Sequence, residues 1–308
     1  MSNAVLVVSV PNEELRDTLD DHSTDVRVIV WDMAGPSPEP QIDMVIPPYM
    51  STLALLDRLR GVRTRLVQSQ SDGYDGVGDA LPPGHVFANA ASVHETATSE
   101  LALTLILASQ RGVADFVRAA AQGRWAPGRY RGLADCRVLL VGYGGIGKAI
   151  EDRLIPFEVD IVRVARTARD TARGSVHAID ELGVLLPDAD VVVVAVPLTE
   201  ATRHLIDDAF LARVRDGALV VNVSRGPVGD TDALVAHASS GRIRLALDVT
   251  DPEPLPDGHR LFSLANVLIS PHVGGATSAM TPRLVRLVRE QIDRMIRGDE
   301  PLNVVIRS

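Results

Sequence analysis

Three glycines in this sequence have a spacing that suits the binding of a phosphate group. Gly142, Gly144 and Gly147 form the pattern Gly-X-Gly-X-X-Gly directly after the apolar run Leu139–Val141, and a helical pattern follows at Lys148–Leu154. In such a strand–turn–helix unit the first glycine permits the tight turn, the second lets the backbone approach a pyrophosphate, and the third lets the helix pack closely on the strand. The helix N-terminus then faces the negative charge. The pattern predicts a dinucleotide site, and the alternative is a glycine-rich turn without a ligand.

The side chains at the end of the next predicted strand distinguish between the two nicotinamide dinucleotides. A site for NAD has an acidic residue there, about 20 residues after the glycines, which binds the ribose 2′-hydroxyl. In this chain the strand ends with Ala165, Arg166 and Thr167, and Arg169 follows. A guanidinium binds a 2′-phosphate through paired, charge-assisted hydrogen bonds, whereas a carboxylate would repel it. NADP(H) is therefore the preferred cofactor, with NAD(H) as an alternative, unless both arginines are only solvated surface residues.

A series of further motifs resembles the D-isomer-specific 2-hydroxyacid dehydrogenase family over essentially the whole chain. Within that family, Ala165, Arg166 and Arg169 look most like the cofactor motif of the NADPH-linked glyoxylate/hydroxypyruvate reductases. The resemblance implies a D-specific oxidoreductase that moves a hydride between the nicotinamide and a small 2-keto or 2-hydroxy acid. Besides the glycine pattern, the motifs are Ser71–Asp75, Gly123–Trp125, Val196–Thr199, Asn222–Gly226, Leu247–Val249 with Glu253–Pro254, and Ser270–Gly275.

Three residues of these motifs match what the reduction of a 2-keto acid needs. His272 suits the proton donor at the carbonyl, because an imidazole titrates near neutrality. Glu253 matches the family's carboxylate, which would pair with the other ring nitrogen and stabilise the imidazolium. Arg225 matches the arginine that binds the substrate and orients its carbonyl. Each of the three alone could be a structural residue, but their order and motif context favour catalysis.

The resemblance also implies a set of binding residues. Backbone N–H groups of Ser71, Asp72 and Gly73 would bind the substrate carboxylate together with Arg225. Tyr49 or Met50, in the loop Pro47–Met50, would lie over the substrate, although a packing role suits them equally. Asp72 departs from the family, which has an apolar or small residue there. An acid beside a carboxylate is unfavourable unless it points away or pairs with a cation. The predicted cofactor contacts are Gly142, Tyr143, Gly144, Gly145, Ile146, Gly147, Ala165, Arg166, Thr167, Arg169, Val196, Pro197, Thr202, Val223, Ser224, Asp248, His272 and Gly274.

The order of strands and helices indicates an α/β fold with two Rossmann-like or flavodoxin-like domains. Short apolar runs alternate with helical patterns, as is typical of parallel sheets covered on both faces. We expect helices at Asn12–Asp20, at Ser51–Leu59 with a serine N-cap, at Val93–Gly123 and at Pro282–Arg297, and an apolar tail at Leu302–Ile306. The predicted strands are Val5–Val10, Val26–Val30, Asp43–Ile46, Thr64–Gln68, Val86–Ala88, Arg137–Val141, Asp160–Ala165, Val191–Val196, Ala218–Val223, Ile243–Asp248 and Asn266–Ser270.

A chain of 308 residues is long enough for two domains. Residues 1–93 and 279–308 are expected to form a substrate-binding, flavodoxin-like domain, and residues 94–278 a nucleotide-binding Rossmann domain. The active-site cleft would lie between them, with hinges at Asn89–Val93 and Gly275–Ala279. The helical pattern Val93–Gly123 is long for a helix that packs only in its own domain. Together with the family resemblance, it predicts a homodimer contact.

Composition and charge argue against several other classes of protein. The net charge of −9 and the lack of a long basic run speak against nucleic acid or an anionic membrane as partner. Cys136 is the only cysteine, and no apolar run approaches the length of a membrane span, so we expect a soluble, cytoplasmic protein. No Cys/His cluster suggests a metal site. The main alternative function is a dinucleotide-sensing binding protein of the same fold that has no turnover.

Overall fold

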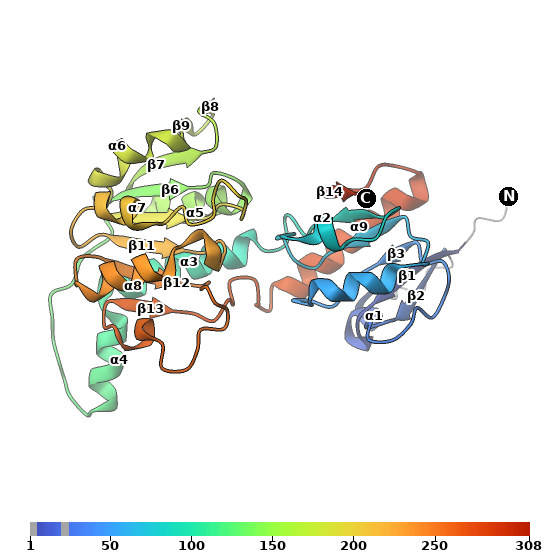
Figure 1. Cartoon of the computed structure of the whole chain (residues 1–308), viewed down its shortest axis with the longest axis horizontal. Coiled ribbons are helices and arrows are strands. Elements are labelled where there is room, and N and C mark those ends of the chain that lie inside the picture. The colour runs from blue at the N-terminus through green and yellow to red at the C-terminus, as the bar shows by residue number, and fades with distance from the viewer. Residues whose placement is uncertain (1–4, 20–24) are drawn as a thin grey trace. The chain divides into compact units, whose positions relative to one another are not determined.

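The computed structural model describes residues 5–19 and 25–308, and the chain divides into two compact units (Figure 1). Unit 1 consists of Met1–His94 and Thr277–Ser308, and unit 2 consists of Glu95–Ala276. Each unit has its own sheet, in which most neighbouring strands are parallel, and its own buried apolar core. The chain therefore has the predicted α/β fold with two Rossmann-like units. The roles predicted for the two parts stay predictions.

Unit 1 is built on a six-stranded sheet with the order β14-β5-β4-β3-β1-β2. Its neighbouring strands are parallel, except that β14 runs antiparallel to β5. The segment predicted as an apolar tail, Leu302–Ile306, thus provides an edge strand of the sheet. The strands are β1 (Leu6–Val10), β2 (Val26–Val30), β3 (Met44–Val45), β4 (Leu66–Gln68), β5 (Val86–Ala88) and β14 (Val304–Arg307).

The helices of unit 1 are α1 (Glu13–Leu19), α2 (Val77–Ala80) and α9 (Met280–Arg297). Along α9, apolar side chains repeat about once per turn and pack into the same core as β1. The helix predicted over Ser51–Leu59 with a serine cap is instead the 3₁₀ helix η1 (Leu53–Leu59), preceded by Thr52 without a side-chain cap. Leu56 and Leu59 are its buried residues, and a spacing of three matches the three-residue turn of a 3₁₀ helix. Asp20, the last residue of the first predicted helix, lies outside the described residues.

Unit 2 is built on an eight-stranded sheet with the order β13-β12-β11-β10-β6-β7-β9-β8. The first strand, β6, lies between β7 and β10, so the chain changes direction across the sheet at its carboxyl end, which is where such sheets bind ligands. The strands are β6 (Arg137–Val141), β7 (Asp160–Ala165), β8 (Arg169–Thr171), β9 (Gly174–Ala178), β10 (Val191–Val194), β11 (Leu219–Asn222), β12 (Arg244–Leu247) and β13 (Val267–Ile269).

Helices cover both faces of the sheet in unit 2. Because successive residues of a strand point to opposite faces, each strand packs against both layers of helices. In β6, Val138 and Leu140 belong to one apolar cluster, and Leu139 and Val141 belong to the other. The first cluster includes side chains of α3 (Glu95–Arg111) and α5 (Gly145–Leu154). The second includes side chains of α6 (Leu182–Leu185), α7 (Asp208–Arg213) and α8 (Thr231–Ser239). This double burial explains why the strands read as continuous apolar runs.

Two features of unit 2 differ from the predictions. The long helical pattern is broken at Gly112, where α3 ends and α4 (Val113–Ala121) begins. Gly112 has φ +64°, in the left-handed region, and a Cβ there would lie 1.9 Å from a ring carbon of Tyr130, so this position requires glycine. The strands β8 and β9 form an antiparallel hairpin that was not predicted. No helix in the described residues is long and apolar enough to span a bilayer.

Candidate active site

The glycine-rich turn leaves the carboxyl end of β6, at the point where the strand order reverses. Gly142 has φ +106°, and a Cβ there would lie 2.3 Å from the carbonyl oxygen of Ala195. A Cβ at Gly147 would lie 2.1 Å from the carbonyl oxygen of Gly142. At Gly144, in contrast, an added Cβ would meet no protein atom within 4 Å. Packing thus explains the first and third glycines, and the openness at the second fits the approach of a pyrophosphate to the backbone.

Helix α5 begins directly after this turn. Its N-cap residue, Gly144, has no side chain that could accept hydrogen bonds from the first turn. Among the residues that the structure describes, the N–H groups of Gly145, Ile146 and Gly147 have no acceptor, and the N–H of Lys148 is the first to bond within the helix, 3.1 Å from the carbonyl oxygen of Gly144. Free N–H groups and the helix dipole attract an anion. The residues present therefore fit the pyrophosphate of a dinucleotide.

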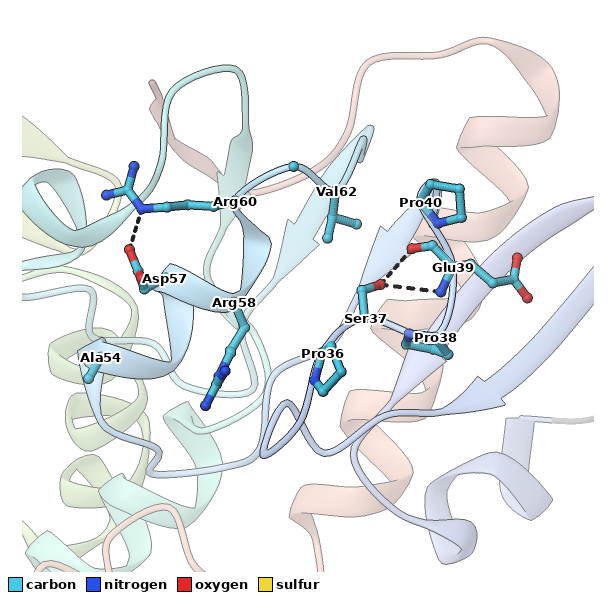
Figure 2. Close-up of a pocket in the computed structure, with 11 residues that line it drawn as sticks. Pro36, Ser37, Pro38, Glu39, Pro40, Ala54, Asp57, Arg58, Arg60 and Val62 are labelled. Carbon is cyan, nitrogen blue, oxygen red and sulfur yellow. Dashed lines mark hydrogen bonds and ion pairs between the residues drawn. The ribbon is translucent and has the colours of Figure 1, made fainter.

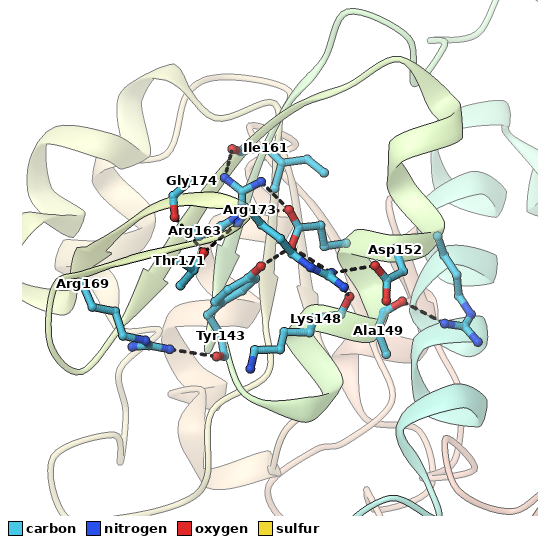
Figure 3. A network of polar contacts seen from close by, with 12 residues as sticks. Tyr143, Lys148, Ala149, Asp152, Ile161, Arg163, Arg169, Thr171, Arg173 and Gly174 are labelled. Carbon is cyan, nitrogen blue, oxygen red and sulfur yellow. Dashed lines mark hydrogen bonds and ion pairs between the residues drawn. The ribbon is translucent and has the colours of Figure 1, made fainter.

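Tyr143, within the glycine pattern, turns its side chain into a buried polar network (Figure 3). Its hydroxyl donates a hydrogen bond to the carboxylate of Glu151 on α5, whose side chain is only 1% exposed. The same carboxylate accepts hydrogen bonds from Arg163 Nε at 2.8 Å and from Arg173 at 3.4 Å. The network ties the turn to α5, β7 and the β8–β9 hairpin. Only the backbone of Tyr143 is left for the predicted contact with a cofactor.

The charges in this network shift the pKa values of its members. Burial alone would raise the pKa of the Glu151 carboxyl, but hydrogen bonds from Arg163 and Tyr143 outweigh it and hold that pKa below its usual value. Burial and the hydrogen bond to Glu151 raise the pKa of the Tyr143 hydroxyl. At neutral pH Glu151 is therefore a carboxylate and Tyr143 a neutral donor, as the hydrogen bond between them requires.

The two arginines predicted to select the cofactor have different surroundings. Arg169 lies on β8, and its Nη2 donates to the carbonyl oxygen of Tyr143 at 3.1 Å, so it holds the glycine-rich turn. Arg166 follows β7 and is exposed, and over residues 5–19 and 25–308 its side chain makes no hydrogen bond or ion pair. Thr167 is also exposed, and Ala165 ends the strand. Of the two guanidinium groups, that of Arg166 is the one not engaged with the protein.

The predicted contacts after β10 form a compact turn. The Thr202 hydroxyl donates to the carbonyl oxygen of Pro197 at 2.7 Å and accepts from the N–H of Thr199 at 2.8 Å. Val196 and Thr202 are both buried. The side chain of Thr202 therefore shapes the backbone around Val196 and Pro197.

Arg225 follows β11 in a turn that is held from beneath by Asn222. The side-chain amide of Asn222 donates to the carbonyl oxygen of Arg225 at 3.1 Å. Its oxygen accepts from the N–H and the hydroxyl of Ser224, at 3.0 and 2.6 Å. The next residue must be glycine, because a Cβ at Gly226 would lie 1.8 Å from the carbonyl oxygen of Thr250. Asn222 and Ser224 are buried, as is Val223, so the backbone that carries Arg225 is rigid.

His272 and Glu253 form a hydrogen-bonded pair on the loops after β13 and β12. The distance from His272 Nδ1 to Glu253 Oε1 is 2.5 Å, and the two side chains are 26% and 38% exposed. Because a carboxylate can only accept, Nδ1 carries a proton and Nε2 is the ring nitrogen left to exchange a proton with a substrate. Sequence reasoning paired these residues, and the structure brings them together.

Asp248 holds the loop of His272 in place. Its Oδ1 accepts from the Ser270 hydroxyl at 2.6 Å and the Val273 N–H at 3.0 Å, and its Oδ2 accepts from the Gly274 N–H at 3.0 Å. The backbone of His272 has φ +52°, which is uncommon for a residue other than glycine, and its N–H donates to the Asp248 carbonyl oxygen at 2.7 Å. Both carboxylate oxygens of Asp248 thus anchor this loop, although the sequence suggested a cofactor contact for that residue.

The loop predicted to bind the substrate carboxylate lies in unit 1, after β4. The N–H of Ser71 donates to the hydroxyl of Ser69 at 2.9 Å, so one of the predicted N–H donors is engaged within the loop. The carbonyl oxygen of Ser71 accepts from the N–H of Ala90 at 2.9 Å. Asn89 donates to the Asp72 backbone oxygen at 2.7 Å and to its Oδ1 at 3.0 Å. The acid that departs from the family pattern is therefore held by an amide donor.

Tyr49, the other predicted substrate contact, stacks on His94, with ring centroids 5.9 Å apart and an angle of 22° between the planes. The Nε2 atom of His94 in turn lies 2.6 Å from the carbonyl oxygen of Gln70, the residue directly before the carboxylate-binding loop. Sequence reasoning missed His94, because a single histidine outside any motif carries no signal.

A surface groove of about 780 Å³ in unit 1 is lined by none of the predicted site residues (Figure 2). It lies between the proline-rich segment Pro36–Pro40 and η1. Arg60 pairs with Asp57, and Glu39 pairs with Arg27 at 2.6 Å, so these charges are neutralised within the protein. Apart from Arg58, the charged side chains that line the groove are therefore paired within the protein. In the described part of the chain, no group of His, Cys, Asp and Glu side chains could hold a metal ion.

Known proteins are similar to this chain in sequence and in fold. Residues 103–274 match the family described as D-isomer specific 2-hydroxyacid dehydrogenase, NAD binding domain. The glyoxylate reductase of Pyrococcus horikoshii is 33% identical over 80% of this chain and 77% of the relative, and that of Thermococcus gammatolerans is 34% identical over 79% and 76%. A crystal structure of a D-isomer specific 2-hydroxyacid dehydrogenase from Xanthobacter autotrophicus Py2, in complex with NADPH and MES, is 28% identical over 99% of both chains, with a TM-score of 0.83.

Proposed function

The chain belongs to the D-isomer specific 2-hydroxyacid dehydrogenase family and is an oxidoreductase that acts on the CH–OH group of donors, and we propose that it interconverts a small 2-keto acid and the D-2-hydroxy acid with NADP(H). The substrate class is that of glyoxylate and hydroxypyruvate. The observation that carries this proposal is the hydrogen-bonded pair of His272 and Glu253. His272 follows β13 and Glu253 follows β12, and β12 pairs with β11, the strand that precedes Arg225.

The three residues divide the chemistry of the reduction between them. The nicotinamide, when bound, supplies a hydride to carbon 2 of the keto acid. His272 gives the proton on Nε2 to the carbonyl oxygen, which becomes the hydroxyl of the product. Glu253 stabilises the imidazolium before this transfer and keeps the proton on Nδ1 after it. The guanidinium of Arg225 binds the substrate and polarises its carbonyl. The oxidation of the hydroxy acid uses the same groups in reverse.

Unit 2 would bind the cofactor and unit 1 the substrate carboxylate. In unit 2, the open turn at Gly144 and the free N–H groups of α5 support a pyrophosphate site. Arg166, exposed and not engaged with the protein, would bind the 2′-phosphate of NADP(H). In unit 1, the loop that begins at Ser71 would bind the carboxylate, with the Asp72 side chain held by Asn89.

A second copy of the chain would cover helix α4. This helix and the segment after it expose large apolar side chains, among them Val117 at 64% and Trp125 at 95%. Exposed apolar side chains gathered on one short stretch of the chain are typical of a protein interface. We therefore keep the homodimer contact in the region predicted from the sequence, but place it on α4 and Trp125, since α3 packs against α5 and the sheet of its own unit.

Turnover of 2-keto acids tests the proposed function. We expect NADPH oxidation with glyoxylate, hydroxypyruvate or pyruvate, and a loss of several orders of magnitude in kcat in His272→Ala with the Kd of NADPH unchanged. His177→Ala is the matched control, because His177 also pairs through Nδ1 with a carboxylate, Glu181, at 2.9 Å in the same unit. Tight NADPH binding without turnover of any 2-keto acid would refute the proposal and favour a dinucleotide sensor.

A further inference from the structure

His94 links the two loops of unit 1 that are proposed to contact the substrate. It ends the segment of residues 89–94, in which Asn89 and Ala90 already bind the loop Ser71–Gly73. The third contact comes from the His94 ring, whose Nε2 lies 2.6 Å from the carbonyl oxygen of Gln70, the residue before that loop. The segment of residues 89–94 thus contacts three consecutive residues, Gln70, Ser71 and Asp72, at the start of the carboxylate-binding loop.

The same ring also supports the loop that carries Tyr49. It stacks on the Tyr49 ring at a centroid distance of 5.9 Å. Gln70 adds a second link, because its side-chain amide donates to the carbonyl oxygen of Pro47 at 2.8 Å. His94 and Gln70 are 6% and 7% exposed, so both links lie in the interior of unit 1. The separation of the two loops therefore depends on one buried histidine and its glutamine partner.

The surroundings of His94 determine the form of its ring. A carbonyl oxygen can only accept, so Nε2 carries the proton that is shared with Gln70. Nδ1 is buried and has no hydrogen-bond partner in the described residues. The ring thus donates through Nε2 to Gln70 and presents a flat face to Tyr49.

We propose that His94 is a positioning residue that sets the distance between Tyr49 and the loop Ser71–Gly73, and thereby limits the size of the 2-keto acid that the enzyme accepts. This inference rests on the proposed function. If the loop binds the carboxylate and Tyr49 covers the substituent on carbon 2, the separation of the two determines which substituent fits. Glyoxylate has a hydrogen there, and each added methylene tests that space.

Two substitutions separate the two contacts of His94. His94→Phe keeps a flat ring against Tyr49 but loses the donor to Gln70, and His94→Gln keeps a donor but loses the ring. His85→Gln is the matched control, because His85 is 5% exposed in the same unit and bonds to Thr64 instead. The measurements are kcat and KM for glyoxylate and for 2-ketobutyrate at saturating NADPH, with the Kd of NADPH from its fluorescence.

We expect His94→Phe to raise the KM for glyoxylate roughly tenfold with little change in kcat, as expected for one lost buried hydrogen bond. The ratio of kcat/KM for 2-ketobutyrate to that for glyoxylate should rise, also roughly tenfold, because the loop Ser71–Gly73 is no longer held at its distance from Tyr49 once the bond to Gln70 is lost. His94→Gln should restore the KM for glyoxylate in part. His85→Gln and the Kd of NADPH should stay at the wild-type values.

A wild-type enzyme without activity on any 2-keto acid overturns the proposed function and this inference with it. An active wild type combined with an unchanged ratio in His94→Phe, or with equal losses for both acids, overturns the inference alone. Tyr49→Ala serves if His94→Phe does not fold, because it should open the same space and raise the same ratio. The double variant Tyr49→Ala/His94→Gln should then shift the ratio no further than Tyr49→Ala does, and additive shifts would count against the inference.

Discussion

Replacing Asp248 with asparagine would remove one hydrogen-bond acceptor beneath the His272 loop without changing the size of the side chain. The carboxylate accepts from the Val273 N–H at one oxygen and from the Gly274 N–H at the other. An asparagine side chain has one oxygen and one NH₂ group, and the NH₂ group cannot accept. Whichever way the amide is turned, its NH₂ faces one of these two backbone N–H groups. Either orientation therefore leaves a donor without a partner, the buried N–H of Gly274 or the half-buried N–H of Val273.

The magnitude follows from that lost acceptor. A buried backbone N–H without a partner costs about 1–3 kcal/mol. The carboxylate also holds His272 at φ +52°, a conformation that persists only where the surroundings impose it. We expect the free energy of unfolding of unit 2 to fall by about 1–3 kcal/mol. If the same energy is lost from the positioning of His272, kcat/KM for the keto acid falls roughly 5- to 150-fold.

Thermal denaturation and steady-state kinetics measure the two effects. For a domain of this size, each kcal/mol corresponds to about 2–4 °C in Tm. Asp232→Asn is the control, because it makes the same chemical change at an exposed residue of α8. The KM for NADPH should stay close to the wild-type value in both variants.

One result would refute this reasoning about Asp248. If Asp248→Asn keeps the Tm and kcat of the wild type and raises only the KM for NADPH, the carboxylate contacts the cofactor and does not position His272. The cofactor contact suggested by the sequence would then be correct.

Three further predictions concern the cofactor site, the buried network and the interface. Arg166→Ala should raise the KM for NADPH roughly 10- to 100-fold and leave that for NADH unchanged, whereas Arg169→Ala should weaken both cofactors alike because it holds the glycine-rich turn. Glu151→Gln should lower the free energy of unfolding at pH 7 by about 1.5–3 kcal/mol. Because the folded state lowers the pKa of Glu151, its stabilisation is complete above the unfolded value of about 4.3 and is lost as the pH falls through the folded value. Val117→Glu should yield a monomer by light scattering, whereas Val184→Glu, at a residue on α6 that is 74% exposed, should not.

Each of these predictions has a result that contradicts it. Equal losses with NADPH and NADH in Arg166→Ala would remove the phosphate contact. A stability difference between wild type and Glu151→Gln that does not shrink as the pH falls through the folded pKa of Glu151 would show that the charge of the carboxylate is not what stabilises the network. A monomeric wild type, or a dimer that survives Val117→Glu, would contradict an interface on α4.

Most of the sheet strands could be predicted because their sequences carry a local signal. β2, β5, β6 and β7 have the predicted bounds, since each is a short run made mostly of apolar residues. The elements that were missed lack such a signal. β8 is the polar, largely exposed run Arg169–Thr171 and forms only by pairing with β9. At Gly112 the glycine itself is the local signal, but the sequence does not say that its backbone is left-handed or that Tyr130, distant in sequence, fills the space beside it.

The sequence by itself identified the motifs of the candidate site, and only the tertiary structure decided what their side chains contact. The glycine pattern could be read from the chain because it encodes local backbone geometry, namely a tight turn, a close approach and a helix N-terminus. The directions of Asp248 and Asp72 could not, because they depend on partners 26 and 17 residues away, Gly274 and Asn89. A hydrogen bond forms only where the fold brings a donor and an acceptor within about 3 Å, and residue spacing along the chain does not specify that distance.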